Sequence, residues 1–126
     1  MSLLHTLKFL LNHPLNHARP MRALWRYLSW QAGSRLVPGP VLVPFIEDIA
    51  LLAEPGMTGA TGNIYCGLHE FEDMAFVLHA IQPGDLFVDV GANVGTYSLL
   101  ACAGGGACLP LSRYPRRFAT SRVTSW

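Results

Sequence analysis

Residues 84–101, GDLFVDVGANVGTYSLLA, restrict the possible folds of this chain more than any other stretch. The segment LFVDV is nearly all apolar, which is typical of a strand covered on both faces of a parallel sheet. Gly91 and Gly95 punctuate the turn that follows, and TYSLLA has the composition of an opening helix. A strand that enters a helix through a tight turn predicts an α/β fold.

The turn itself is suited to a nucleotide-like ligand. Gly91 permits a tight turn, and Gly95 permits close packing or the approach of a ligand at the start of the helix. Asn93 stands where a dinucleotide-binding fingerprint has its middle glycine, and asparagine tolerates left-handed backbone angles better than most residues. We expect backbone N–H groups at this helix start to be free to point at a ligand.

Asp89, beside the turn, discriminates between such ligands. Its carboxylate would repel a pyrophosphate, whereas it suits a ligand that brings ammonium or hydroxyl donors. S-adenosylmethionine carries an amino group and a sulfonium charge and has no phosphate. The residues therefore favour S-adenosylmethionine over NAD, and a nicotinamide-dependent oxidoreductase is the less favoured alternative.

A family resemblance lies in residues 61–101, TGNIYCGLHEFEDMAFVLHAIQPGDLFVDVGANVGTYSLLA. This segment resembles the beginning of FkbM-type S-adenosylmethionine-dependent methyltransferases, in which a helix rich in Glu and Asp precedes a GD-apolar-DVGANVG motif. The resemblance implies a Rossmann-like methyltransferase fold and methyl transfer to a hydroxyl oxygen of a small-molecule or glycan substrate. It also implies that the cofactor-binding turn consists of Asp89, Gly91, Asn93 and Gly95.

Four further side chains are weaker candidates for the same pocket. Glu70 and Asp73 lie on the preceding helix, where acidic groups also suit the positive end of a helix dipole. Tyr65 and Tyr97 lie near the turn in sequence, although packing in the core is the commoner role of such tyrosines. The sequence assigns no catalytic residue.

The chain departs from the family pattern after Asp89. A nucleotide-binding half of this kind needs an acid about 20 residues past the first strand to hold the ribose hydroxyls, but no Asp or Glu follows Asp89. Residues 104–126 have no helical or alternating period and an abruptly changed composition. We expect a truncated or frame-shifted methyltransferase, with the change near residues 104–107. The alternative is an inactive fragment that acts, if at all, as a binding module.

The N-terminal residues predict two helices. Apolar residues recur at helical spacing in residues 3–11, and Pro14 should end that helix. A second helix should begin near Pro20, with one apolar stripe made of Met21, Leu24, Trp25 and Leu28 and positive charge on its other faces from Arg19, Arg22 and Arg26. We expect this region to pack on the domain as a helical cap. An interfacial helix that touches a membrane or a partner is the alternative.

Between these helices and the Gly-rich turn, residues 41–57 predict a β-hairpin, residues 58–63 a loop, and residues 69–81 a helix that Pro83 and Gly84 terminate. The expected fold is thus an incomplete Rossmann-like methyltransferase fold of the α/β class, preceded by N-terminal helices and a hairpin. Its expected parts are a helical segment (1–40), the start of the methyltransferase domain (41–103) and an atypical tail, frame-shifted or disordered (104–126).

Composition excludes several other classes of function. With a net charge of +1 and no stripe of basic and aromatic residues, the chain is not expected to bind nucleic acid. Three cysteines without CxxC spacing indicate neither a disulfide framework nor a zinc site, so a reduced cytoplasmic setting is expected. His13 and His17 have a metal-binding spacing, but Pro14 lies between them, and no metal is expected. The apolar run in residues 3–11 is too short and too interrupted for a signal peptide or an integral membrane segment. The sequence predicts no oligomeric state.

Overall fold

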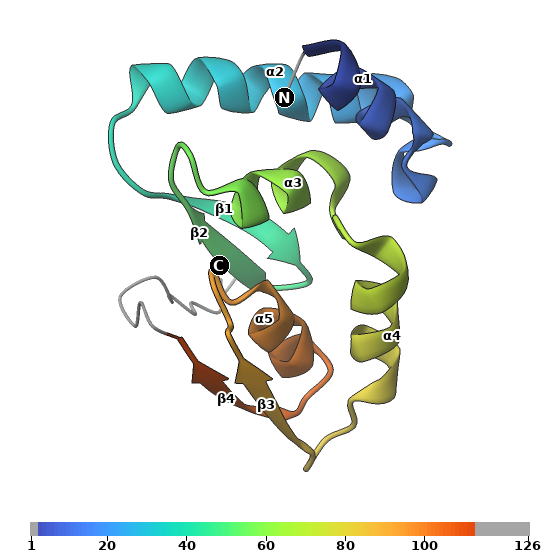
Figure 1. The fold of residues 1–126 in the computed structure, drawn as a ribbon, viewed down its shortest axis with the longest axis vertical. Helices are drawn as coiled ribbons and strands as arrows, with labels where there is room; N and C mark the ends of the chain where they lie inside the picture. The colour runs from blue at the N-terminus through green and yellow to red at the C-terminus, as the bar shows by residue number, and fades with distance from the viewer. Residues whose placement is uncertain (1–2, 113–126) are drawn as a thin grey trace.

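The computed structural model describes residues 3–112 and arranges them as helices around two small sheets (Figure 1). The elements, in chain order, are α1 (Leu3–Asn12), the 3-10 helix η1 (Pro14–Asn16), α2 (Pro20–Leu36), β1 (Val41–Ile46), β2 (Ile49–Ala53), α3 (Thr58–Cys66), α4 (Phe71–Ala80), β3 (Leu86–Val90), α5 (Thr96–Ala103) and β4 (Ala107–Leu111). The described residues thus have a mixed α/β fold, as expected, and are compatible with an incomplete α/β domain.

Helices α1 and α2 form one layer, and buried Asn16 joins them. The Asn16 side-chain amide donates to the carbonyl of Leu10 at 3.0 Å, and its Oδ1 accepts a hydrogen bond of 2.9 Å from Arg26 Nη2. Pro14 and Pro20 set the end of α1 and the start of α2. Proline disrupts the interior of a helix but is well suited to its first turn. Both predicted helices are confirmed.

Helix α2 packs on the rest of the chain through the face that lies opposite most of its apolar stripe. Ala23 and Trp30 are buried against the rest of the chain, whereas Met21, Trp25 and Leu28 are 75, 70 and 52% exposed. Helix α2 therefore packs on the rest of the chain as expected of a helical cap, but Met21, Trp25 and Leu28 of its apolar stripe take no part in the packing. Ala23 allows the helix to approach closely, and Trp30 fills the space beneath it, so the opposite face of α2 meets the core.

The predicted hairpin is confirmed. β1 pairs with β2 in antiparallel register, with an irregularity between Pro44 and Ile46, and Glu47 in the turn adopts a φ of 48°. β2 is the more buried strand. Its side chains join Trp30 and Leu99 in the hydrophobic core, which therefore unites α2, the hairpin, α3 and α5.

Residues 58–63 belong to α3, so the loop predicted there is wrong. Gly59 and Gly62 lower helix propensity, but both lie where another segment approaches closely. A Cβ on Gly59 would lie 3.2 Å from Val94 Cγ2, and a Cβ on Gly62 would lie 2.6 Å from His69 Nδ1. Tertiary packing has overridden local propensity here.

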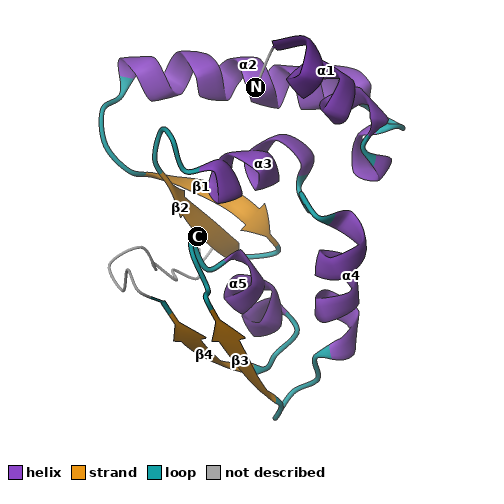
Figure 2. Ribbon diagram, viewed as in Figure 1, coloured by secondary structure: helices purple, strands orange, loops and turns teal. Residues whose placement is uncertain are grey.

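β3 and β4 form a parallel pair connected through α5, with Leu86 opposite Ala107 and Val90 opposite Leu111 (Figure 2). Residues 107–111, for which no regular structure was predicted, are thus a strand. It includes Pro110, which an edge strand tolerates. The predicted strand at β3 is confirmed, but its expected burial on both faces is not. Among the described residues α5 packs on one face only, and Leu86, Val88 and Val90 are 65, 46 and 80% exposed on the other.

The two sheets are separate two-stranded units. The rest of the predicted atypical tail, residues 113–126, lies outside the described residues. Within residues 3–112, no helix combines the length and the apolar character needed to cross a bilayer.

Candidate functional site

The Gly-rich turn between β3 and α5 has the backbone geometry that its sequence predicts. Gly91, Asn93 and Gly95 all have positive φ angles, of 82°, 48° and 82°. Residues with a Cβ rarely adopt such angles, and asparagine does so more readily than most. The turn closes tightly, because the amide of Gly95 donates to the carbonyl of Ala92 at 2.6 Å.

Three backbone amides of this turn already donate hydrogen bonds within the chain. Gly91 and Ala92 both donate to the carbonyl oxygen of Leu111, at 2.8 and 3.2 Å, and Gly95 donates within the turn. The expectation that backbone N–H groups here are free for a ligand is therefore wrong for these three residues. β4, which was not predicted, takes up two of the donors that would otherwise favour a phosphate.

A cavity of about 200 Å³ lies against the turn. Three of the four predicted site residues, Asp89, Gly91 and Asn93, line it, whereas Gly95 shapes the turn and is not among its lining residues. Glu70 and Tyr97 line the cavity as well. Asp73 and Tyr65, the other two candidates, do not line it, and Tyr65 instead accepts a hydrogen bond of 3.1 Å from Gln31.

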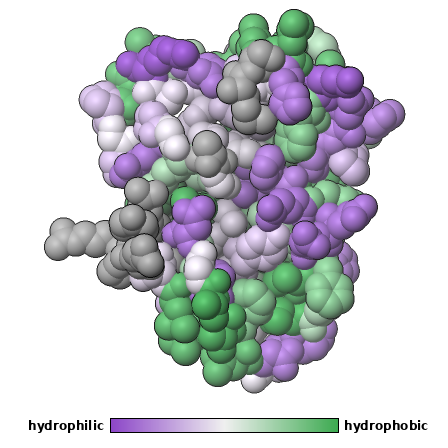
Figure 3. Space-filling model, viewed as in Figure 1, coloured by the Kyte–Doolittle hydropathy of each residue, from purple (hydrophilic) through white to green (hydrophobic). Residues whose placement is uncertain are grey.

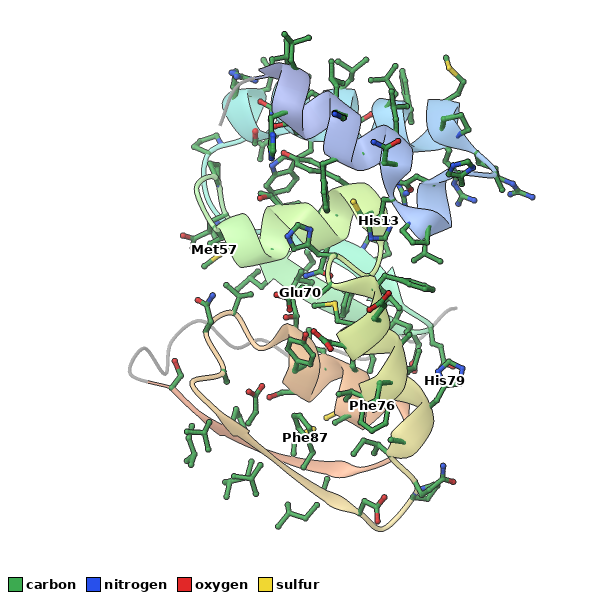
Figure 4. All side chains as sticks on the ribbon, turned by 45° about the vertical axis from the view of Figure 1, so that its right-hand side comes forward. His13, Met57, Glu70, Phe76, His79 and Phe87 are labelled. Carbon is green, nitrogen blue, oxygen red and sulfur yellow. The ribbon has the colours of Figure 1, made fainter. Side chains whose placement is uncertain are left out.

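Among residues 3–112, two carboxylates and no Lys or Arg line this cavity. Asp89 Oδ2 accepts a hydrogen bond of 2.7 Å from Ser98 Oγ, which fixes the carboxylate against α5. Glu70 Oε2 accepts a hydrogen bond of 2.6 Å from the hydroxyl of Tyr97. Figure 4 shows Glu70 between the upper and lower parts of the molecule, at the start of α4. The cavity is thus negatively charged.

Tyr97 remains protonated in this setting. Partial burial, the hydrogen bond to Glu70 and the negative charges of Glu70, Asp73 and Asp89 all raise the pKa of its phenol far above the usual value. The hydroxyl is therefore a permanent donor to Glu70 at neutral pH. Its effect is to hold the Glu70 carboxylate at the rim of the cavity.

Asn63 and His69 also line the cavity, and the sequence analysis did not find them. The buried Asn63 amide donates to the carbonyl of Gly59 at 2.7 Å, and its Oδ1 accepts a hydrogen bond of 2.9 Å from the backbone N–H of His69. It thereby fixes the segment that carries His69 and Glu70. The only sequence signal was an amide directly after Gly62, in a stretch assigned to a loop.

The end of β4 is where the expected ribose-binding acid would stand. Within the described residues this end consists of Leu111 and Ser112, so it carries no carboxylate. Nor do three His, Cys, Asp or Glu side chains of residues 3–112 come together in a group that would hold a metal ion.

Comparisons of this chain with protein-family models, with curated proteins and with solved structures give no significant match.

Proposed function

We propose that this chain contains the cofactor-binding part of an S-adenosylmethionine-dependent methyltransferase with an incomplete Rossmann-like fold, of the FkbM type. The observation that carries the proposal is the cavity at the Gly-rich turn, which two carboxylates and no Lys or Arg of the described residues line. Such a cavity repels phosphate and attracts a cation. The βαβ unit of β3, α5 and β4, with the turn at the carboxyl end of β3, supports the same reading.

The residues of the cavity divide the binding task. Asp89 and Glu70 offer carboxylate oxygens to the ammonium and hydroxyl donors of the cofactor. Gly91 and Asn93, whose φ angles are positive, form the backbone turn that lines the cavity. The bound sulfonium supplies an activated methyl group. The acceptor is proposed to be a hydroxyl of a small molecule or glycan. A cavity of about 200 Å³ holds only part of a ligand of this size, since small-molecule pockets commonly measure about 300–1,000 Å³.

Affinity should be lower than in a complete domain. Within the part of the chain that the structure describes, no carboxylate stands at the end of β4 to accept hydrogen bonds from the ribose hydroxyls. A hydrogen bond to a charged group contributes about 1.5–3 kcal/mol, so its absence corresponds to roughly 10- to 100-fold weaker binding. This feature also favours the second candidate, a fragment that is catalytically inactive and acts as a binding module.

Isothermal titration calorimetry on the full chain distinguishes these functions. We expect S-adenosylmethionine and S-adenosylhomocysteine to bind, and ATP and NADH, which carry phosphates, to give no heat. Asp89→Asn should weaken binding by at least about tenfold, since it removes the charge but keeps an acceptor for Ser98. Asp85→Asn is the matched control, because the Asp85 carboxylate accepts a hydrogen bond from the backbone N–H of Gln82 and does not line the cavity. Silence with both sulfur compounds would support the inactive fragment.

A further inference from the structure

Helix α2 is apolar on two opposite faces. Ala23 and Trp30 lie on the face that meets the core. On the other side an exposed stripe, the outer stripe of α2, runs along the whole helix at spacings of three or four residues and consists of Met21, Trp25, Leu28, Ala32 and Leu36. Met21 and Leu36, at its two ends, are 75 and 80% exposed. An apolar stripe of this length is unusual on a surface that faces only water.

Helix α1 and η1 extend the apolar surface. Leu4, Leu11 and Leu15 are 79, 50 and 46% exposed. Figure 3 shows hydrophobic residues at the top of the molecule, over these helices, beside strongly hydrophilic ones. Figure 4 shows many side chains of the α1–α2 layer projecting away from the sheets. The two helices therefore present one broad surface that the rest of the described chain leaves uncovered.

The same layer is strongly basic. The first acidic residue of the sequence is Glu47, whereas five basic residues precede it, namely Lys8, Arg19, Arg22, Arg26 and Arg35. Arg26 is directed inward to Asn16, but Arg22 and Arg35 are exposed. At 100° per residue, Arg22 and Arg35 fall on opposite sides of the outer stripe. The apolar surface is thus flanked by positive charge on both sides.

We propose that the α1–α2 layer docks on the surface of a lipid bilayer that contains anionic headgroups. The outer stripe would enter the boundary between headgroups and acyl chains, as the apolar face of an interfacial helix does. Trp25 is a side chain that favours this boundary, and the flanking arginines would contact lipid phosphates. A second copy of the chain fits less well, because it would place one basic layer against another without acidic partners.

Vesicle co-sedimentation tests the proposal independently of any cofactor. Vesicles of phosphatidylglycerol and phosphatidylcholine should bind the full chain, and vesicles of phosphatidylcholine alone should bind it much more weakly. A triple variant replaces three exposed side chains of the outer stripe, Met21→Gln/Trp25→Gln/Leu28→Gln. This variant should lower the vesicle partition coefficient by at least about tenfold. Arg22→Gln should lower it about fivefold on anionic vesicles only.

The exposed face of β3 offers a matched control. Leu86→Gln/Val90→Gln removes apolar side chains that are 65 and 80% exposed, as the stripe residues are, but on the other side of the molecule. It should leave vesicle binding unchanged. Equal loss in both sets of variants, or equal binding to neutral and anionic vesicles, would overturn the proposal. The proposal would also be overturned if the full chain did not bind vesicles but formed a dimer that the stripe variants dissociate.

Tryptophan fluorescence reports the same event from within the stripe. The emission of Trp25, which is 70% exposed in the free chain, should shift to shorter wavelength when anionic vesicles are added. The chain has a third tryptophan, Trp126, outside the described residues, so the experiment is carried out in a Trp126→Phe background. In that background Trp25→Phe should keep most of the vesicle binding but lose most of the shift, since Trp30 is already buried. An unchanged shift in this variant would show that the helix face does not enter the lipid, and would overturn the proposal.

Discussion

The hydroxyl of Tyr97, in the first turn of α5, donates a hydrogen bond of 2.6 Å to Oε2 of Glu70, the residue immediately before α4. The bond connects two helices across the rim of the candidate cavity. Tyr97→Phe should therefore lower the free energy of unfolding by about 0.5–1.5 kcal/mol. Urea denaturation measures the difference. Tyr27→Phe is the control, because the Tyr27 ring packs on Tyr65 and its hydroxyl makes no hydrogen bond within the described residues.

The same bond predicts a dependence on pH. Burial and Glu70 raise the pKa of Tyr97, so the native chain keeps the phenolic proton at a pH where the unfolded chain releases it. Proton release therefore favours the unfolded state above the ordinary tyrosine pKa of about 10. The advantage of the wild type over Tyr97→Phe should be constant below about pH 10 and should shrink as the pH rises beyond it. An advantage that grows above this pH would contradict the assignment.

Gly62 and Gly33 form a matched pair of helical glycines with opposite expectations. Gly62→Ala should destabilise the fold by about 1–3 kcal/mol and displace His69, because the added Cβ would lie 2.6 Å from His69 Nδ1. Gly33→Ala should stabilise it by about 0.5–1 kcal/mol, since a Cβ there meets nothing within 4 Å and alanine favours the helix. Thermal unfolding of both variants checks the pair. Stabilisation by Gly62→Ala would show that α3 does not pack on His69.

Asn63 should be the most sensitive polar residue near the cavity. Asn63→Ala leaves the backbone N–H of His69 without its partner and removes the side-chain bond to the Gly59 carbonyl, which should cost about 1–3 kcal/mol. Because the same bonds fix the segment before α4, the variant should also weaken S-adenosylmethionine binding. Asn93→Ala, at the exposed turn, should cost less stability. Equal stability of Asn63→Ala and wild type would show that the amide does not fix this segment.

The sequence predicted the local part of the site better than its surroundings. Asp89, Gly91 and Asn93 were found because a strand, a turn with positive φ angles and a helix follow each other without interruption. These are local requirements, and each of them favours a particular residue type at its position. The helices α1 and α2 and the hairpin were predicted for the same reason, because proline and glycine residues lie near their ends.

The errors come from contacts that are distant in sequence. Gly59 and Gly62 have the composition of a loop, and only the approach of Val94 and His69 explains a helix with two glycines. β4 was not predicted because its pattern, with a proline in the strand, becomes regular only when it pairs with β3. The outer stripe of α2 has the periodicity of a core face, and periodicity alone does not tell which of two apolar faces is buried.

Cys66 provides a test of the packing between α3 and the N-terminal layer. Burial raises the pKa of its thiol to about 11, although Arg26 and Asn16 act in the opposite direction. Alkylation needs the thiolate, so the native thiol should react slowly near neutral pH, and its rate should rise about tenfold per pH unit up to about pH 11. Iodoacetamide labelling followed by peptide mass spectrometry measures this rate, with the urea-unfolded chain as the control. If Cys66 reacts only after local unfolding, the rate will instead level off near the ordinary thiol pKa of about 8.5. A plateau at that pH would therefore show that the thiol is not titrated within the fold, whereas a continuing rise would confirm that it is.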